Sequence, residues 1–282
     1  MFHLPHVLIG LSLFAVNALF NLAAANGQPQ RVVTLAPHLT EWVYLLGAEA
    51  SLVAVSAYSN FPVAAQELPL VADANGVNFK QLLALEPDLV IVWSGGNKPQ
   101  DISRLESMGI SLFKSSPQQL DDISRELALL GAQLQRHAVA TEIVRQFDQR
   151  LARLRATYSQ QAPLSVFFYS WTKPLMSIGT NAWGNKALAV CGATTLFADS
   201  PTDYPEVRLA EVLKRQPHAL VSLMTGSITE QQMFWQPHKA VLDVPLLLTD
   251  ADKIHRFTPR VLDAIELLCE QLHFIRTDPQ SD

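Results

Sequence analysis

Two distant stretches of the chain repeat one pattern of apolar and polar positions. In each, a segment of helical character stops at a proline, Pro87 or Pro217, and a short run that is apolar on both faces follows. Proline cannot continue a helix and biases the residue before it toward extended geometry, and an apolar run without alternation is typical of a parallel strand covered on both sides. The pattern therefore predicts two helix–strand units of the same kind, one in each half of the chain.

The segments upstream of these two units also correspond. Apolar runs at residues 32–35 and 166–169 each precede a predicted helix, and these helices end at residues 46–48 (Leu-Gly-Ala) and 191–193 (Cys-Gly-Ala). We therefore predict an α/β protein with two similar lobes. A crevice between two lobes is a common place for a small-molecule site.

The segment between the two halves has a different pattern. Residues 137–161 contain no Gly or Pro, and apolar side chains recur there at helical spacing with arginines on the remaining surface. A helix of about 25 residues spans roughly 37 Å, enough to cross from one lobe to the other. We predict an N-terminal lobe at residues 26–135, a connecting helix at 136–162 and a C-terminal lobe at 163–282. An ordinary long surface helix is the alternative.

The N-terminal segment predicts export. An apolar stretch at residues 7–20 leads to three alanines at 23–25 that fit the small-residue rule for cleavage, and the stretch is shorter than the ~20 residues of a membrane-spanning helix. We predict a cleaved signal peptide at residues 1–25. Because His3 and His6 are the only basic side chains ahead of the apolar stretch, an uncleaved anchor is the alternative.

Composition excludes one class of partner and suggests a disulfide. The 282 residues carry a formal net charge of −5 without a dense basic run, which argues against nucleic acid because neutralising phosphates requires a Lys- or Arg-rich face.

Cys191 and Cys269 are the only cysteines. In an exported protein they favour a disulfide within the second lobe, and two buried free thiols are the alternative.

The sequence lacks the common catalytic signatures. The glycine-rich segment at residues 94–97 has no Gly-Lys-Ser/Thr of a phosphate-binding loop, and neither a Gly-x-Ser-x-Gly elbow nor a His-Glu-x-x-His helix occurs. The histidines are scattered, with no pair at ligand spacing. We therefore predict a protein that is not an enzyme, with no metal site and no cofactor.

Aromatic side chains mark the predicted strand ends instead. Tyr58 follows one strand of the first half and Trp93 ends another, Trp171 follows a strand of the second half, and Tyr204 lies in a proline-rich loop. Ligands of parallel α/β folds bind beyond the carboxyl ends of the strands, so these rings are predicted to face the crevice and contact a bulky, partly apolar ligand. Burial in the core is the alternative for each ring alone.

Several motifs resemble the periplasmic cobalamin-binding proteins that serve an ABC importer. They include residues 31–41, Trp93-Ser-Gly-Gly-Asn97, Thr258-Pro259-Arg260 and the two cysteines, within a likeness that extends from about residue 31 to residue 272. The resemblance implies two Rossmann-like lobes with parallel sheets, joined by one long backbone helix. It also implies a periplasmic monomer that holds cobalamin in the cleft, as a transported ligand rather than a cofactor, and delivers it to a permease dimer with its ATPase.

The resemblance also implies individual ligand contacts. Tyr58 and Trp93 match corrin-contacting positions of the first lobe, and Tyr204 stands where the family carries a second-lobe aromatic side chain. Trp171 and His38 are added because either can offset a family aromatic that is replaced by Ala74 here. The predicted ligand-binding residues are His38, Tyr58, Trp93, Trp171, Tyr204, Asp252, Lys253, Ile254, His255 and Arg256.

His38 carries two interpretations. A neutral imidazole ligates transition metals, so His38 could coordinate the cobalt of the corrin. The alternative is a histidine that lines the cleft or caps a helix by hydrogen bonding.

The sequence departs from the resemblance at the permease-docking positions. The docking carboxylates of the family fall on Lys80 and Ala210, with Glu211 next to the second position. Positive charge at Lys80 would repel a permease arginine. We therefore expect either a permease with different docking residues or a substitute carboxylate at Glu67 or Glu206.

Two rival functions stay open at this stage. The first is a haem or ferric-siderophore receptor of the same fold, with His38 or Tyr58 as the iron ligand. The second is an enzyme or an envelope interaction protein built on the same scaffold.

Overall fold

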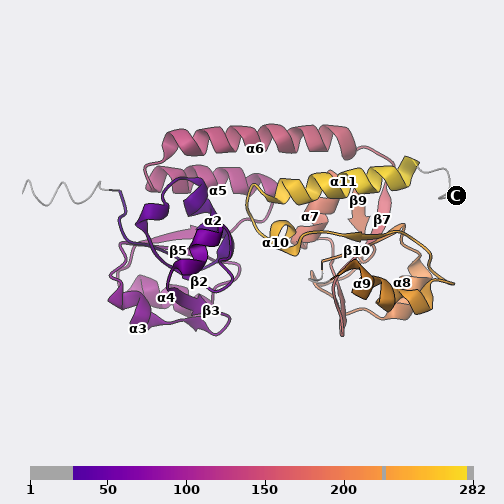
Figure 1. Ribbon diagram of the computed structural model, residues 1–282, viewed down its shortest axis with the longest axis horizontal. Helices are drawn as coiled ribbons and strands as arrows, with labels where there is room; N and C mark the ends of the chain where they lie inside the picture. Colours follow the sequence, from indigo (N-terminus) through magenta and orange to yellow (C-terminus); the bar gives the residue numbers. More distant parts are fainter. Residues whose placement is uncertain (1–27, 224–226, 278–282) are drawn as a thin grey trace, which may run out of the picture.

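The computed structural model describes residues 28–223 and 227–277. Figure 1 shows two α/β lobes below a long helix, α6 (His137–Tyr158), which extends over both of them. The predicted signal peptide, residues 1–25, lies outside the described residues. Within the two described ranges, no helix is both long and apolar enough to cross a membrane.

The N-terminal lobe is built on a six-stranded sheet in the order β4-β3-β2-β1-β5-β6. All neighbouring strands are parallel except the β3–β4 hairpin. The strands are β1 (Val32–Thr34), β2 (Leu52–Ser56), β3 (Leu70–Asp73), β4 (Gly76–Val77), β5 (Leu89–Trp93) and β6 (Leu112–Ser115). The helices are α2 (Pro37–Leu45), α3 (Phe79–Ala84), α4 (Pro99–Ser107) and α5 (Leu120–Gln133), with short 3-10 turns at Glu49–Ser51 and Val63–Glu67.

The C-terminal lobe has a second sheet in the order β11-β10-β7-β8, with β9 also paired to β7. Only the β7–β8 pair is antiparallel. The strands are β7 (Leu164–Thr172), β8 (Leu175–Ser177), β9 (Ala193–Thr195), β10 (Ala219–Ser222) and β11 (Leu246–Leu248). The helices are α7 (Trp183–Val190), α8 (Leu209–Arg215), α9 (Ile228–Trp235), α10 (Ala251–Ile254) and α11 (Val261–Thr277), with a 3-10 turn at Gln236–His238.

The repeated sequence pattern is confirmed as a repeated fold unit. α3 leads to β5 and α8 leads to β10, and both strands are central in their sheets. The upstream helices α2 and α7 also end alike, because Gly47 and Gly192 follow them with φ of +66° and +64°. Such left-handed geometry after a helix favours glycine.

The predicted connecting helix exists, but it does not join the lobes alone. α6 has 22 residues and ends at Tyr158, four residues before the predicted end at residue 162. α5 lies beside it over the first lobe and α11 over the second (Figure 1). Arg155 of α6 binds Asp121 of α5 through two hydrogen bonds of 2.8 and 2.7 Å, and Arg150 reaches Asp263 of α11 at 2.6 Å. The lobes are therefore held by a layer of three helices.

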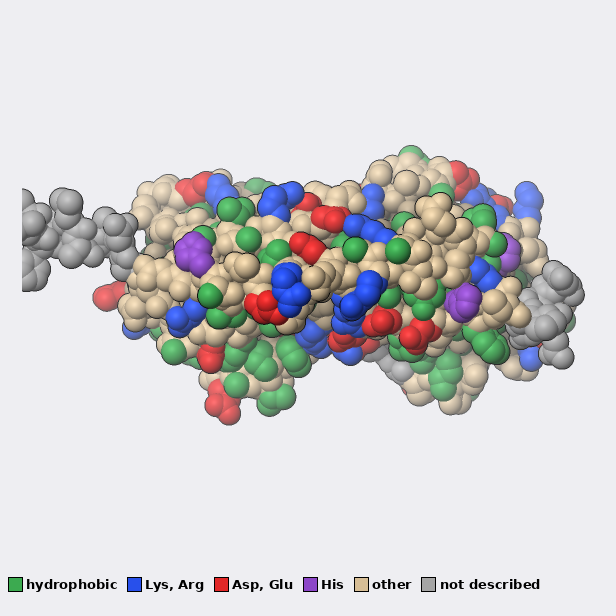
Figure 2. Space-filling view, turned by 90° about the horizontal axis from the view of Figure 1, so that it is seen from above, with side chains coloured by type: hydrophobic (Ala, Val, Ile, Leu, Met, Phe, Trp, Pro, Cys, Tyr) green, Lys and Arg blue, Asp and Glu red, His purple; other side chains and the backbone are tan. Residues whose placement is uncertain are grey.

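The outer face of this helical layer is charged. Figure 2 shows acidic and basic side chains mixed along it, with apolar side chains scattered among them. One buried stripe of α6 faces inward instead, through Phe147, Leu151 and Leu154. This amphipathic division is the one that the helical spacing predicted.

The predicted disulfide is confirmed, and the alternative of two free thiols is wrong. Cys191 follows α7 directly and Cys269 lies on α11, with both residues fully buried and their Cα atoms 4.7 Å apart. The bridge fixes α7 against α11, within the second lobe.

Candidate functional site

Trp93 ends β5, and its ring folds back over the glycines that follow it. A Cβ atom at Gly96 would overlap the indole ring, and one at Gly95 would lie 2.8 Å from the indole nitrogen. The Trp93 N–H donates to Asn97 Oδ1 at 2.8 Å, and Asn97 Nδ2 donates to the Leu35 carbonyl at 2.7 Å. The glycines of the Trp-x-Gly-Gly-Asn motif thus leave room for the Trp93 ring, and the asparagine fixes the turn that follows Trp93.

His38 lies in an aromatic cluster with Trp93. The centroid of its ring is 5.5 Å from that of Trp93, 5.1 Å from Phe257 and 5.6 Å from Trp42, all edge to face. His38 is only 3% exposed. Burial, aided by the charge of Arg256, lowers the pKa of His38 to about 3, so the imidazole is neutral at physiological pH. His38 therefore supports the Trp93 ring and does not line an open surface.

Tyr58 follows β2 in an unusual backbone conformation. Its φ is +64°, which is uncommon for a residue other than glycine, and its side chain is highly exposed, at 80%. Such a conformation persists only where surrounding contacts hold it, and it is frequent at functional sites. Arg256 Nη2 donates to the Tyr58 carbonyl at 3.2 Å, so one of these contacts comes from the far end of the chain.

A network of ion pairs and hydrogen bonds is centred on the buried Glu41 carboxylate and reaches the Tyr58 backbone, and we call it the Glu41 network. It consists of Glu41, Asn60, Asp252, Arg256 and Arg260. The two oxygens of the Glu41 carboxylate bind Arg256 at 2.7 Å and Arg260 at 2.9 Å. Arg256 also donates to Asn60 Oδ1 at 2.6 Å, and Asn60 Nδ2 donates to Asp252 Oδ2 at 2.9 Å. Residues from the two ends of the chain therefore meet at the loop that carries Tyr58.

The aromatic residues of the second lobe are differently supported. Trp171 is 62% exposed and Tyr204 is 56% exposed. The prediction that Trp171 follows its strand is wrong, because β7 continues to Thr172 and Trp171 pairs with Met176 of β8. The antiparallel partner extends the strand by hydrogen bonding. Tyr204 lies in the predicted loop, between β9 and α8.

The other predicted ligand residues divide by burial. Asp252 and His255 are exposed and Lys253 is partly exposed, whereas Ile254 and Arg256 are buried. The Ile254 carbonyl accepts a hydrogen bond of 2.7 Å from Trp183 Nε1, so this residue joins α10 to α7. Ligand contact by these residues stays a prediction. Asp252 and Arg256 connect the second lobe with the Tyr58 loop.

Sequence analysis missed Glu41, Asn60, Phe257 and Arg260. Arg260 belongs to the Thr258-Pro259-Arg260 motif that carried the resemblance, but no role followed from the motif. Its guanidinium carbon lies 3.6 Å above the centroid of the Phe61 ring, in addition to the pair with Glu41. The motif marked this segment of the sequence, but it did not show that Arg260 contacts Glu41 and Phe61.

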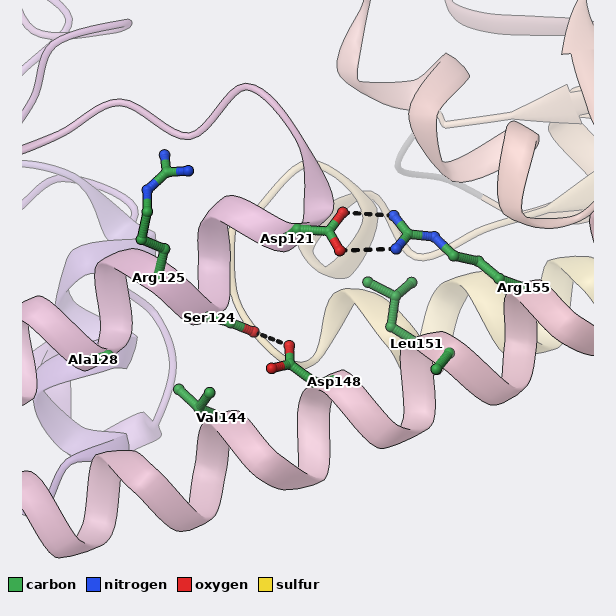
Figure 3. Close-up of a pocket in the computed structure, with 9 residues that line it drawn as sticks. Asp121, Ser124, Arg125, Ala128, Val144, Asp148, Leu151 and Arg155 are labelled. Carbon is green, nitrogen blue, oxygen red and sulfur yellow. Dashed lines mark hydrogen bonds and ion pairs between the residues drawn. The ribbon is translucent and has the colours of Figure 1, made fainter.

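Two hollows of the surface are not lined by the four aromatic residues predicted to contact the ligand. A groove of about 420 Å³ between α5 and α6 is crossed by the Asp121–Arg155 pair and by a hydrogen bond from Ser124 to Asp148 (Figure 3). These contacts join α5 to α6 and so strengthen the helical layer. A larger hollow of about 1000 Å³ opens at the amino ends of β7, β10 and β11, next to α11.

The predicted docking positions lie on two helices at the side of the molecule opposite to α6 (Figure 1). Lys80 on α3 and Ala210 on α8 are both exposed. Glu211 is half-buried and lies 4.0 Å from Arg215 of the same helix. The geometry is compatible with one partner that contacts both lobes, and the docking roles stay predictions.

Two lobes with aromatic side chains at strand ends define a class of small-molecule-binding proteins. Comparison with known proteins specifies the class further. Residues 32–236 match the periplasmic binding protein family, so the chain belongs to that family. It is 33% identical over 268 residues to the vitamin B12-binding protein of Vibrio cholerae, covering 93% of this chain and 97% of the relative. It is 37% identical over 254 residues to that of Pectobacterium carotovorum, covering 88% and 90% of the two chains.

Solved structures agree with this assignment. The crystal structure of the periplasmic vitamin B12-binding protein BtuF of Vibrio cholerae superposes with a TM-score of 0.82 at 32% identity, covering 89% of this chain and 99% of that one. A periplasmic heme-binding protein from Pseudomonas aeruginosa superposes with a TM-score of 0.75 at 26% identity, covering 86% and 92%. The predicted fold of two lobes with mostly parallel sheets is therefore confirmed.

Proposed function

We propose that this periplasmic binding protein captures cobalamin between its lobes and delivers it to the permease of an ABC importer. It binds its ligand and does not transform it. The observation that carries the proposal is the presence of exposed or partly exposed rings, Tyr58, Trp93, Trp171 and Tyr204, at strand ends or loops of both lobes. The vitamin B12-binding proteins that match most of this chain are named for the same ligand.

The chemistry of cobalamin suits these residues. Its corrin is a large, partly apolar macrocycle with amide side chains at the rim. Aromatic rings supply contact area at low conformational cost, while exposed Asp252 can accept hydrogen bonds from amide groups. We assign Tyr58 and Trp93 to the face of the corrin on the first lobe, and Trp171 and Tyr204 to the second lobe.

The haem alternative loses His38, one of its two candidate iron ligands, whereas Tyr58 is exposed. A haem receptor would use a protein side chain on the iron, and the sequence offered His38 or Tyr58. His38 is enclosed by Trp42, Trp93 and Phe257, so it could reach a metal only if this cluster opened. Cobalamin carries its own nitrogen ligand below the cobalt and requires none from the protein. The same enclosure argues against cobalt coordination by His38.

The transport partner completes the proposal. A permease dimer with its ATPase would receive the ligand from a monomeric binding protein that is exported by cleavage after Ala25. α3 and α8 lie on one side of the molecule and carry Lys80, Ala210 and Glu211. Since Lys80 is basic, the facing permease residue is expected to be acidic or neutral.

A calorimetric titration tests the ligand. Purified, ligand-free protein is titrated with cyanocobalamin, adenosylcobalamin, haemin and a ferric siderophore under one set of conditions. The proposal predicts saturable binding of about one equivalent of cobalamin and much weaker binding of the iron ligands. Tight haemin binding without cobalamin binding would refute it.

A further inference from the structure

We infer that Glu41 is a positioning residue for the ligand-binding edge of the first lobe. Through Arg256 it fixes the Tyr58 backbone and the side chains of Asn60 and Asp252. This inference rests on the proposed function only where it concerns ligand affinity. The positioning itself can be measured in the ligand-free protein.

The position of Glu41 makes it the anchor of the network. Its side chain is only 4% exposed, and each carboxylate oxygen meets a different arginine, Arg256 or Arg260. Both arginines come from the segment between α10 and α11, more than 200 residues further along the chain. Glu41 holds both arginines firmly, because loss of the buried carboxylate charge would leave two guanidinium groups without this counter-charge.

Arg256 links Glu41 to the Tyr58 loop and to Asp252. One terminal nitrogen binds Glu41, and the other donates to the Tyr58 carbonyl at 3.2 Å and to Asn60 Oδ1 at 2.6 Å. That second nitrogen also lies 3.2 Å from Asp252 Oδ1. The planar guanidinium has a fixed fork geometry, so fixing one nitrogen fixes the direction of the other.

The Tyr58 loop has a second attachment to the same helix. Ser59 Oγ lies 2.9 Å from Thr40 Oγ1, and Thr40 precedes Glu41 on α2. Thr40 and, through Arg256, Glu41 therefore hold the loop at Tyr58, Ser59 and Asn60. Because φ at Tyr58 is positive, the loop is expected to relax toward ordinary backbone geometry when either attachment is lost.

The first test is proteolysis of the ligand-free protein. Chymotrypsin cleaves after tyrosine, and cleavage between Tyr58 and Ser59 requires the loop to leave its turn. Glu41→Gln keeps the shape of the side chain and removes its charge, so we expect cleavage at this bond to accelerate by about tenfold, the factor that corresponds to 1.4 kcal/mol. Fragment masses identify the bond. Arg256→Lys, which keeps the charge but loses the fork, is expected to act in the same direction.

Glu126→Gln is the matched control. Glu126 is also a buried glutamate of the first lobe, and it accepts hydrogen bonds from Ser115 and Ser116 without contact to the Tyr58 loop. It is expected to lower the melting temperature without specific acceleration of cleavage after Tyr58. Equal acceleration in Glu126→Gln and Glu41→Gln, or none in Glu41→Gln and Arg256→Lys, would overturn the inference.

The second test is a double-mutant cycle for cyanocobalamin affinity. Glu41→Gln is expected to weaken binding about tenfold when Tyr58 is present, and by less than about threefold when Tyr58 is replaced by alanine, because the positioned ring is then gone. Equal factors in both backgrounds would contradict the positioning role. If the parent protein does not bind cobalamin at all, the proposed function fails, and the proteolysis result alone decides the role of Glu41.

Discussion

The two lobes present their aromatic side chains in different ways. In the first lobe, the Trp93 ring rests on Gly96 and packs against His38, while the Glu41 network holds the Tyr58 loop. In the second lobe, the exposed Trp171 lies near the end of β7 and Tyr204 on a loop. The comparison indicates that the first lobe is shaped before the ligand arrives. We expect the second lobe to adjust its rings upon binding, at a greater cost in conformational entropy.

The tightest constraint of the second lobe lies elsewhere. The Cys191–Cys269 bridge fixes α7 to α11, and Arg276 of α11 donates to the Cys191 carbonyl. Leu164 at the start of β7 pairs with Ala193, close in sequence to the bridge, whereas Trp171 lies near the other end of this strand. The second lobe is therefore constrained by contacts that support its stability, and the first lobe is also constrained at the proposed ligand-binding edge.

Removal of the disulfide is expected to have the largest effect. Replacing both cysteines by alanine should lower the free energy of unfolding by about 2–5 kcal/mol, because the closed loop restricts the unfolded chain. Urea denaturation measures the loss. Cobalamin affinity below the unfolding transition should be nearly unchanged, and a large loss of affinity would show that the bridge also shapes the ligand-binding edge.

Truncation of single rings tests the comparison directly. Trp93→Ala should weaken cobalamin binding by about 1–3 kcal/mol, as expected of a preorganised anchor, and Trp171→Ala should cost less. Calorimetry on both variants measures the difference. Phe274→Ala removes an exposed aromatic ring of α11, remote from the proposed site, and should leave the affinity unchanged. A greater loss of affinity for Trp171→Ala than for Trp93→Ala would show that the second lobe, and not the first, supplies the stronger aromatic contact.

Gly96→Ala should displace the Trp93 ring without removing it. The added methyl group would overlap the indole, so the ring must leave its position, at a cost in affinity of about 1–2 kcal/mol by the scale of overpacking effects. Introduced into Trp93→Ala, the same substitution should have little further effect. If the losses of affinity in the two single variants add up in the double variant, Gly96 does not act through the Trp93 ring.

His38 should make stability depend on pH. Its folded-state pKa is about 3, below the value of 6.5 in the unfolded chain, so the unfolded state takes up a proton first as the pH falls. The contribution to stability is complete above pH 6.5 and is lost progressively between pH 6.5 and 3. Lowering the pH from 7 to 5.5 should cost about 1 kcal/mol. His38→Gln should remove this component from urea titrations, and an unchanged pH profile in the variant would contradict the assignment.

Domain closure should be the smallest effect. The layer of α5, α6 and α11 offers no multi-strand hinge about which the lobes could rotate. Scattering profiles with and without cyanocobalamin should nearly superimpose. A marked contraction on binding would show that the helical layer bends.

The sequence predicted the repeated features better than the individual contacts. The proline stops and apolar runs predicted the central strands β5 and β10, because local pattern alone fixes such units. The Glu41–Arg256 pair could not be predicted, since its partners are 215 positions apart and neither belongs to a periodic pattern. Likewise, three separate segments enclose His38, and the length of β7 depends on its pairing with β8.

A crystal structure of the complex with cyanocobalamin would distinguish a preorganised first lobe from one that forms on binding. We expect the corrin between the lobes, in contact with Tyr58 and Trp93. It also predicts that the Tyr58 φ stays positive and that the Glu41–Arg256 pair stays intact, while Trp171 and Tyr204 move. A corrin bound elsewhere, or a first lobe that rearranges more than the second, would contradict it.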